Sequence, residues 1–267
     1  TAVMMSPPAP LRAAELQART VVAFDRYVTA TEARITAEVE GPDGFIRLDQ
    51  LPPRDRASTL DELRRDGVHI ERLTTREGGR PIEAPGGLLH HWVGLVFVPG
   101  ATVDEALTLL QDYDRAADIF APSIARSQLR AQDGDRYQVY LRFFLKKVIS
   151  VVLDTEHDVR FFRPSPDRAH SRIVSTRIAE VEDPDTPRER QKPVGQDGGY
   201  LWRMNTYWRF LERDGGVYVQ CESISLSRGI PTGFGWLIGP FVTSIPRESL
   251  EFTLNTTRKT LSEPRGR

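Results

Sequence analysis

Residues 202–226 read WRMNTYWRFLERDGGVYVQCESISL, and this stretch decides the fold. Asp214-Gly215 is a two-residue hairpin signal between two alternating runs. The register set by this turn pairs Phe210 with Val219, Trp208 with Cys221, Thr206 with Ser223, and Met204 with Ser225. Side chains alternate along a strand, so these residues are predicted to share one face with Trp202. The other face carries the charged and larger polar side chains, which makes the first face the predicted inner one. They are Arg203, Asn205, Tyr207, Arg209, Gln220 and Glu222.

Further elements extend outward from this hairpin. Apolar alternation predicts strands at 137–145 and 149–161, and an apolar run predicts one at 91–98. A short strand is predicted near 124–131, and 172–181 is predicted to be extended. Thr102 and Glu105 have the spacing of a capping box at the start of a helix after the first strand. A final helix is predicted from about Pro246 to Leu261. This order predicts an α+β fold, with a curved antiparallel sheet of about seven strands around a long C-terminal helix.

The N-terminal third differs from the rest in having few strong apolar runs. Residues 11–39 are predicted to form a helix, and 58–65 a shorter one. We therefore divide the chain into a helical extension at 1–87, packed on the main domain, and the main domain at 88–267. The polar, proline-containing stretch 182–199 is predicted to be an exposed loop.

Composition excludes several classes of protein. The 267 residues carry a formal net charge of −1, without the basic excess of a nucleic-acid binder. No segment approaches the roughly 20 apolar residues of a membrane span, although transient contact with a membrane surface stays open. The one cysteine, Cys221, excludes an intrachain disulfide. The start at Thr1 is typical of signal-peptide removal and favours a periplasmic or secreted bacterial protein, with a cytoplasmic one as the alternative.

The arrangement resembles the helix-grip fold of the START-like and polyketide cyclase (SRPBCC) superfamily over about residues 90–262. The similarity is carried by Val93–Gly100, by 102–114 with Asp-Tyr-Asp at its end, by Phe-Ala-Pro at 120–122, by Ile-Pro at 230–231, and by the closing helix. That family includes lipid carriers, quinone-binding proteins, hormone receptors and some cyclases. Its members share a cavity under the C-terminal helix, so the resemblance implies an apolar ligand.

The leading hypothesis is a non-catalytic protein that binds an apolar or amphipathic small molecule, such as a lipid, isoprenoid or polyketide-like compound. A curved sheet cannot press against a straight helix along its whole length, so a gap is expected where small residues face the helix. The predicted ligand contacts are Trp202, Thr206, Trp208 and Ser223, with Trp236 and Phe241 above them and His157 across the sheet.

Two other functions remain open. An enzyme of the cyclase or hydrolase kind would use His157 with inward hydroxyls or Tyr137, although a hydrogen-bonded core histidine is the commoner arrangement. An interaction module would use the N-terminal helix or the 182–199 segment. No catalytic set, cofactor or metal site is predicted, because the five histidines lack ligand spacing and Gly233-Phe234-Gly235 lacks the context of a phosphate loop.

Overall fold

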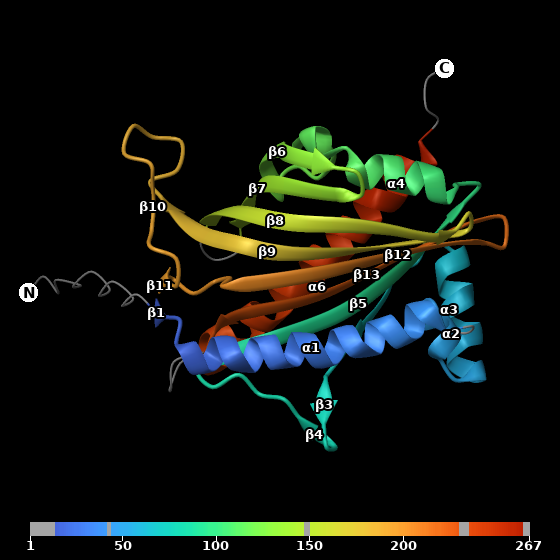
Figure 1. Ribbon diagram of the computed structural model, residues 1–267, viewed down its shortest axis with the longest axis horizontal. Helices are drawn as coiled ribbons and strands as arrows, with labels where there is room; N and C mark the ends of the chain where they lie inside the picture. The colour runs from blue at the N-terminus through green and yellow to red at the C-terminus, as the bar shows by residue number, and fades with distance from the viewer. Residues whose placement is uncertain (1–13, 42–43, 147–149, 230–234, 264–267) are drawn as a thin grey trace, which may run out of the picture.

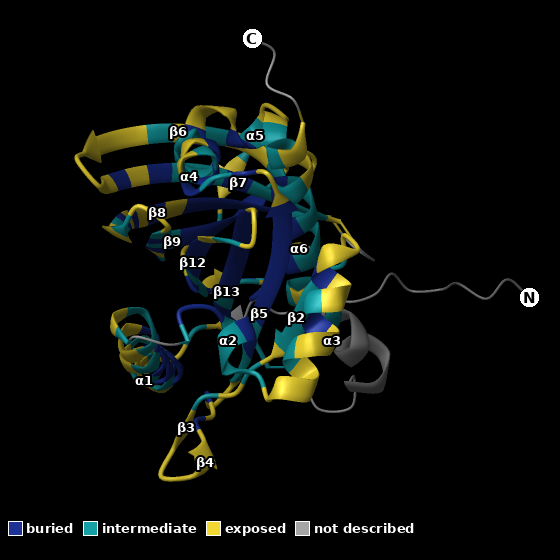
Figure 2. Ribbon diagram, turned by 90° about the vertical axis from the view of Figure 1, so that its right-hand side faces the viewer, coloured by how far each residue is buried: buried dark blue, intermediate teal, exposed yellow. Residues whose placement is uncertain are grey.

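The computed structural model describes residues 14–41, 44–146, 150–229 and 235–263, and the side chains of 235–243 lie outside that description. One long antiparallel sheet has helices on both sides (Figure 1). Viewed from the side, α6 lies against one face and α1 against the other (Figure 2). The predicted α+β helix-grip fold is confirmed.

The main sheet has nine strands among the described residues. Its order is β2 (His69–Arg72), β5 (Gly87–Pro99), β13 (Gly216–Arg228), β12 (Arg203–Arg213), β9 (Arg168–Glu182), β8 (Ser150–Ser165), β7 (Arg136–Lys146) and β6 (Ile124–Asp133), with β10 (Arg190–Gln191) paired to β9. All pairings between these strands are antiparallel among the described residues. The sheet is wider than predicted because β2 and β10 extend it, and β2 comes from the predicted N-terminal extension.

Helices α4 (Val103–Gln111) and α6 (Gly235–Ser262) cover the concave face. Two short helical segments, η1 (Tyr113–Arg115) and α5 (Ala116–Ile119), come directly after α4 in the chain. The predicted capping box at Thr102 and Glu105 is confirmed. The predicted start of the last helix was wrong: α6 begins at Gly235, and the prolines at 240 and 246 each remove a donor without ending it. Gly94 of β5 permits a close approach, because an added Cβ would lie 2.4 Å from Cδ1 of Leu254 in α6.

The outer face is covered by α1 (Ala18–Glu40), α2 (Arg47–Gln50) and α3 (Pro53–Arg64). One apolar cluster joins Phe24 and Val28 of α1 to Ile224 of β13, and a second joins Leu48 and Leu63 of the shorter helices to the sheet. Two small pairs complete the fold: β1 (Ala14–Glu15) with β11 (Gln196–Asp197), and β3 (Arg76–Glu77) with β4 (Arg80–Pro81).

The segment at 182–199 is exposed over much of its length, as predicted, but it is fastened to the sheet. Arg142 of β7 forms ion pairs with Asp154 of β8 at 2.7 Å and with Glu189 of the segment at 2.8 Å. Lys192 donates to Glu180 at 2.5 Å. These ion pairs hold the segment against the sheet. They also supply the partners that buried charges on the strands require.

Candidate functional site

The last hairpin has the predicted register. Trp208 pairs with Cys221 and Thr206 with Ser223, as expected from the turn. Trp208 is 6% exposed and belongs to the cluster that includes Leu250 and Leu254 of α6. The face that carries Trp208 is therefore the concave one, in contact with the C-terminal helix.

A row of partly exposed residues crosses the centre of this concave face. Trp92, Ser223, Thr206 and Ile173 are successive cross-strand neighbours on β5, β13, β12 and β9. All four keep partial exposure, although the neighbouring row with Cys221 and Trp208 is buried. Because these are inner strands of a face that carries helices, the exposure cannot come from a sheet edge. Trp92 was not predicted, because its contact with this row depends on the pairing of β5 with β13.

His157 points to the same face and is buried. It is 2% exposed and pairs with Ser175 of β9 and Val139 of β7. Its Nε2 lies 2.8 Å from Oγ1 of Thr155, and the ring of Phe143 meets it edge-on at 6.2 Å. Burial lowers the pKa of His157 to about 4, so the ring is neutral at pH 7.

Trp202 lies apart from Trp208. It belongs to the cluster under α1, and its Nε1 donates to Asp197 at 3.1 Å. The expectation that it shares the inner face was wrong, because β12 begins only at Arg203 and strand alternation does not extend to residue 202. Trp236 and Phe241 belong to α6, but their side chains lie outside the described residues.

A hollow of about 660 Å³ opens beside α4, where β7 begins and β8 ends. Its floor is apolar, with Leu107 of α4, Tyr137 and Phe161, and its rim carries Gln111 and Arg163. The floor residues belong to or pack against an apolar cluster that includes Val139 and Val159 of the concave face. None of the predicted contact residues lines this hollow.

Two unpartnered polar atoms lie next to the hollow's floor. Tyr113 packs its ring 5.6 Å from that of Tyr137, and Ser171 pairs with Phe161 across the strands. The hydroxyls of both Tyr113 and Ser171 are buried without a hydrogen-bond partner among the described residues. Burial raises the pKa of Tyr113, so its hydroxyl stays protonated. No sequence pattern marks these two residues, because an unpartnered atom is defined only by its surroundings in the fold.

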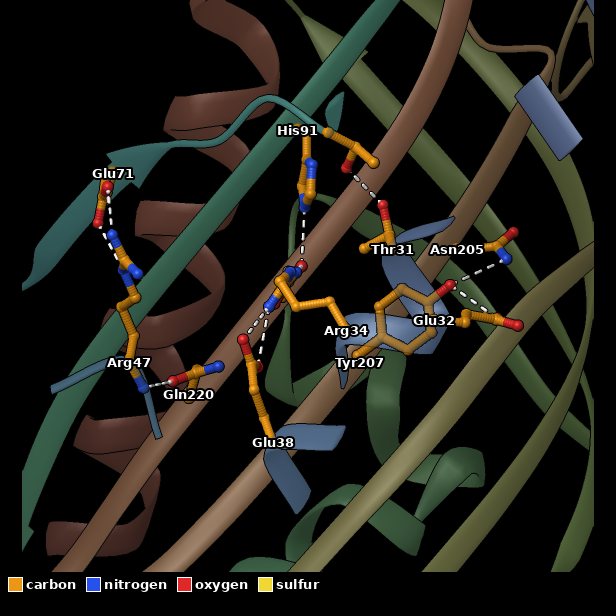
Figure 3. Close-up of polar contacts among 12 residues, drawn as sticks. Thr31, Glu32, Arg34, Glu38, Arg47, Glu71, His91, Asn205, Tyr207 and Gln220 are labelled. Carbon is orange, nitrogen blue, oxygen red and sulfur yellow. Dashed lines mark hydrogen bonds and ion pairs between the residues drawn. The ribbon is translucent and has the colours of Figure 1, made fainter. Parts of the chain in front are cut away.

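The outer face of the same strands carries a buried polar network beneath α1 (Figure 3). Glu222 accepts a hydrogen bond from Nε2 of His91 at 2.8 Å and pairs with Arg34 of α1. Arg34 also donates to both oxygens of Glu38, and Arg209 donates to Glu38 at 2.6 Å. These two arginines and two glutamates neutralise one another, so the network fastens the helix without leaving a free charge.

Hydroxyl groups extend this network along α1. The hydroxyl of Tyr27 lies 2.9 Å from Nδ1 of His91 and accepts from the backbone N–H of Thr75 at 2.9 Å. Tyr207 donates to Glu32 at 2.8 Å. A cavity of about 270 Å³ lies between α1 and the sheet, with His91 and Glu222 in its wall. Its buried charged groups already have partners, which argues against an ionic ligand there.

No described residues form a metal site: groups of three or more His, Cys, Asp or Glu side chains in ligating positions are absent from the described part of the chain. No described helix combines the length and apolar character needed to cross a membrane. The concave face can thus offer apolar contact, neutral hydroxyls and a neutral imidazole. Such a surface suits recognition of a small molecule.

Comparison with known proteins gave matches only among solved structures. Neither protein-family models nor curated protein sequences matched the chain. A STAR-related lipid transfer protein from Xanthomonas axonopodis is 17% identical, with a TM-score of 0.45, and the match covers 72% of this chain and 99% of that one. An aromatase/cyclase from Streptomyces sp. R1128 is 14% identical, with a TM-score of 0.41, and the match covers 65% and 94%. Human STARD10 is 9% identical, with a TM-score of 0.43, and the match covers 83% and 84%.

Proposed function

We propose that the protein binds an apolar or amphipathic small molecule against the concave face of its sheet, beside helix α6. One observation carries this proposal: Trp92, Ser223, Thr206 and Ile173 stay partly exposed in the middle of a face that carries helices. An apolar molecule laid over this row would remove aromatic and aliphatic surface from water, at about 25 cal/mol per Å². The proposal rests on residues of this chain and not on the similarities above.

The hollow beside α4 supports the same function. Its volume of about 660 Å³ is in the range that holds small ligands, and its floor is continuous with the concave-face cluster. The ligand would thus contact residues on β7 and β8 as well as the predicted residues on β12 and β13. Thr206, Trp208 and Ser223 remain proposed contacts.

The enzyme alternative has no supporting observation among the described residues. A general base works best when its pKa lies near the operating pH. Burial lowers the pKa of His157 to about 4, which makes it a weak base, and its Nε2 is already engaged by Thr155. The interaction-module alternative is not favoured either, since the large hydrophobic side chains recorded as exposed are those of Val22, Val194 and Tyr200 only, within the described ranges.

Native mass spectrometry of the gently purified chain tests the proposal. We expect an adduct of lipid-like mass that organic extraction removes. Ser223→Trp places a large ring in the partly exposed row and should reduce adduct occupancy at least tenfold. Thr176→Trp is the matched control, because residue 176 is exposed on β9. Equal occupancy in both variants, or no adduct and no uptake of any apolar probe by the wild type, would refute the proposed function.

A further inference from the structure

The two contacts of the Thr155 hydroxyl determine which nitrogen of His157 donates and which accepts. The hydroxyl of Thr155 donates its single proton to the carbonyl oxygen of Leu141 at 2.9 Å. Its oxygen therefore accepts in the 2.8 Å contact with Nε2 of His157, which must carry the ring proton. Since the ring is neutral, Nδ1 holds a lone pair and can only accept. Among the described residues Nδ1 has no partner, and it is buried.

This unpartnered acceptor indicates something that the protein itself does not supply. A buried polar atom without a hydrogen bond weakens the folded state by a substantial desolvation penalty. The hydroxyl of Ser171 is in the same condition on the same face. Ser171 and Ser175, the cross-strand partner of His157, are four residues apart on β9, which corresponds to about 13 Å along the strand. Ile173, with partial exposure, lies between them.

The side chains of the concave face also limit the charge that a ligand can carry there. The three rows that cross the sheet here are Gly94–Cys221–Trp208–Ser171–Phe161, Trp92–Ser223–Thr206–Ile173–Val159–Tyr137, and His90–Ser225–Met204 with Ser175–His157–Val139. None of these residues is an acid, a lysine or an arginine. An ionised ligand group on these rows would be desolvated without a counter-charge, which is strongly unfavourable.

We propose, on the basis of the function proposed above, that the ligand of the concave face is a neutral, elongated molecule with an O–H or N–H group that donates to Nδ1 of His157. Its far end meets Ser171, about 13 Å away, and its body lies over Ile173 and Thr206. Free fatty acids and phosphate esters are the wrong class for these rows.

A matched set of fluorescent probes tests the proposal on the full chain. We would titrate 2,6-dihydroxyanthracene, its 2,6-dimethoxy ether, unsubstituted anthracene and anthracene-2,6-dicarboxylate. The diol has donors at both ends, the ether can only accept, and the dicarboxylate is charged. We expect the diol to bind at least tenfold more tightly than the ether or the dicarboxylate, the size expected for satisfying a buried polar group.

Variants assign this preference to His157. His157→Leu should reduce the ratio between diol and ether affinities to within about twofold, since the acceptor is gone. Thr155→Val removes the acceptor that holds the proton on Nε2, so the proton can move to Nδ1. The affinity for the ether should then rise relative to the affinity for the diol. This second variant keeps the shape of the site if the first fails to fold. His69→Leu is the control, because His69 pairs with Leu95 on the opposite face of the sheet, and it should keep the preference.

Each outcome has a distinct meaning. Equal binding of diol and ether leaves the proposed function standing and overturns the donor requirement. Tight binding of the dicarboxylate overturns the neutral class. Failure of all the neutral probes to bind overturns the proposed function together with this inference.

Discussion

Replacing Glu222 by glutamine should lower the free energy of unfolding by about 3 kcal/mol. The carboxylate is 1% exposed and is contacted by His91 and Arg34, with Arg209 at 3.8 Å. Glutamine keeps the shape but removes the charge, which leaves both arginines with Glu38 alone. Breaking a buried ion pair from one side costs about 3–5 kcal/mol, because the remaining charge stays desolvated.

The pH dependence of stability gives a second estimate of what the Glu222 carboxylate contributes to the free energy of unfolding. Burial by itself raises the pKa of Glu222, but the hydrogen bond from His91 and the charge of Arg34 outweigh it and lower the pKa from 4.5 to about 2. A group whose pKa is lowered on folding stabilises the protein above its unfolded pKa and loses that effect as the pH falls. The loss should therefore occur between about pH 4.5 and 2, and it amounts to about 3 kcal/mol.

Urea unfolding followed by tryptophan fluorescence measures both quantities. At pH 7 the midpoint of Glu222→Gln should fall with an unchanged slope, and the variant should lose less stability than the wild type below pH 4.5. Glu182→Gln is the control, because Glu182 pairs with Arg190 at the surface, where the side chains are 39% and 75% exposed. It should change stability by less than about 1 kcal/mol. A similarly small change in Glu222→Gln at pH 7 would refute the reasoning.

Three further predictions concern packing and reactivity. Gly94→Ala should cost about 1–3 kcal/mol in urea unfolding, because its Cβ would meet Leu254 at 2.4 Å, and a neutral effect would contradict this close approach. Cys221 is 3% exposed and burial raises the pKa of its thiol, so Ellman's reagent should label it at pH 8 only in urea, and rapid native labelling would show that the helix layer opens. Arg142→Met should cost about 3 kcal/mol by leaving the carboxylate of Asp154 without its counter-charge, and adding Asp154→Leu should recover most of it; no recovery would mean that the loss comes from packing.

The concave face was predictable because its register depends on a local signal. A two-residue turn at Asp214-Gly215 fixes every pair in the hairpin, and alternation then assigns Thr206, Trp208 and Ser223 to one side. Neighbouring strands are less certain from the sequence. β9 has a register shift against β8 between Ser175 and Arg177, so alternation changes phase there, which is why no face could be assigned to Arg177.

The outer face was not predictable in the same way. Arg209 and Glu222 alternate with apolar residues, and this pattern is typical of a strand with one face in water. The structure buries both to 1% exposure, because α1 covers that face. The partner of Arg209, Glu38, is 171 residues away in the sequence. Pairing over that distance follows from the docking of the helix, which no local pattern encodes.

The two faces together explain how the sheet keeps its register. A slip of one residue between β12 and β13 would turn the side chains of one strand to the opposite face. Arg209 or Glu222 would then face Leu250 and Leu254 of α6 without a counter-charge, at a cost of several kcal/mol. The charges beneath α1 thus act against the wrong pairing as well as holding the helix. The same separation keeps the central rows of the concave face neutral, which leaves them suited to an uncharged ligand.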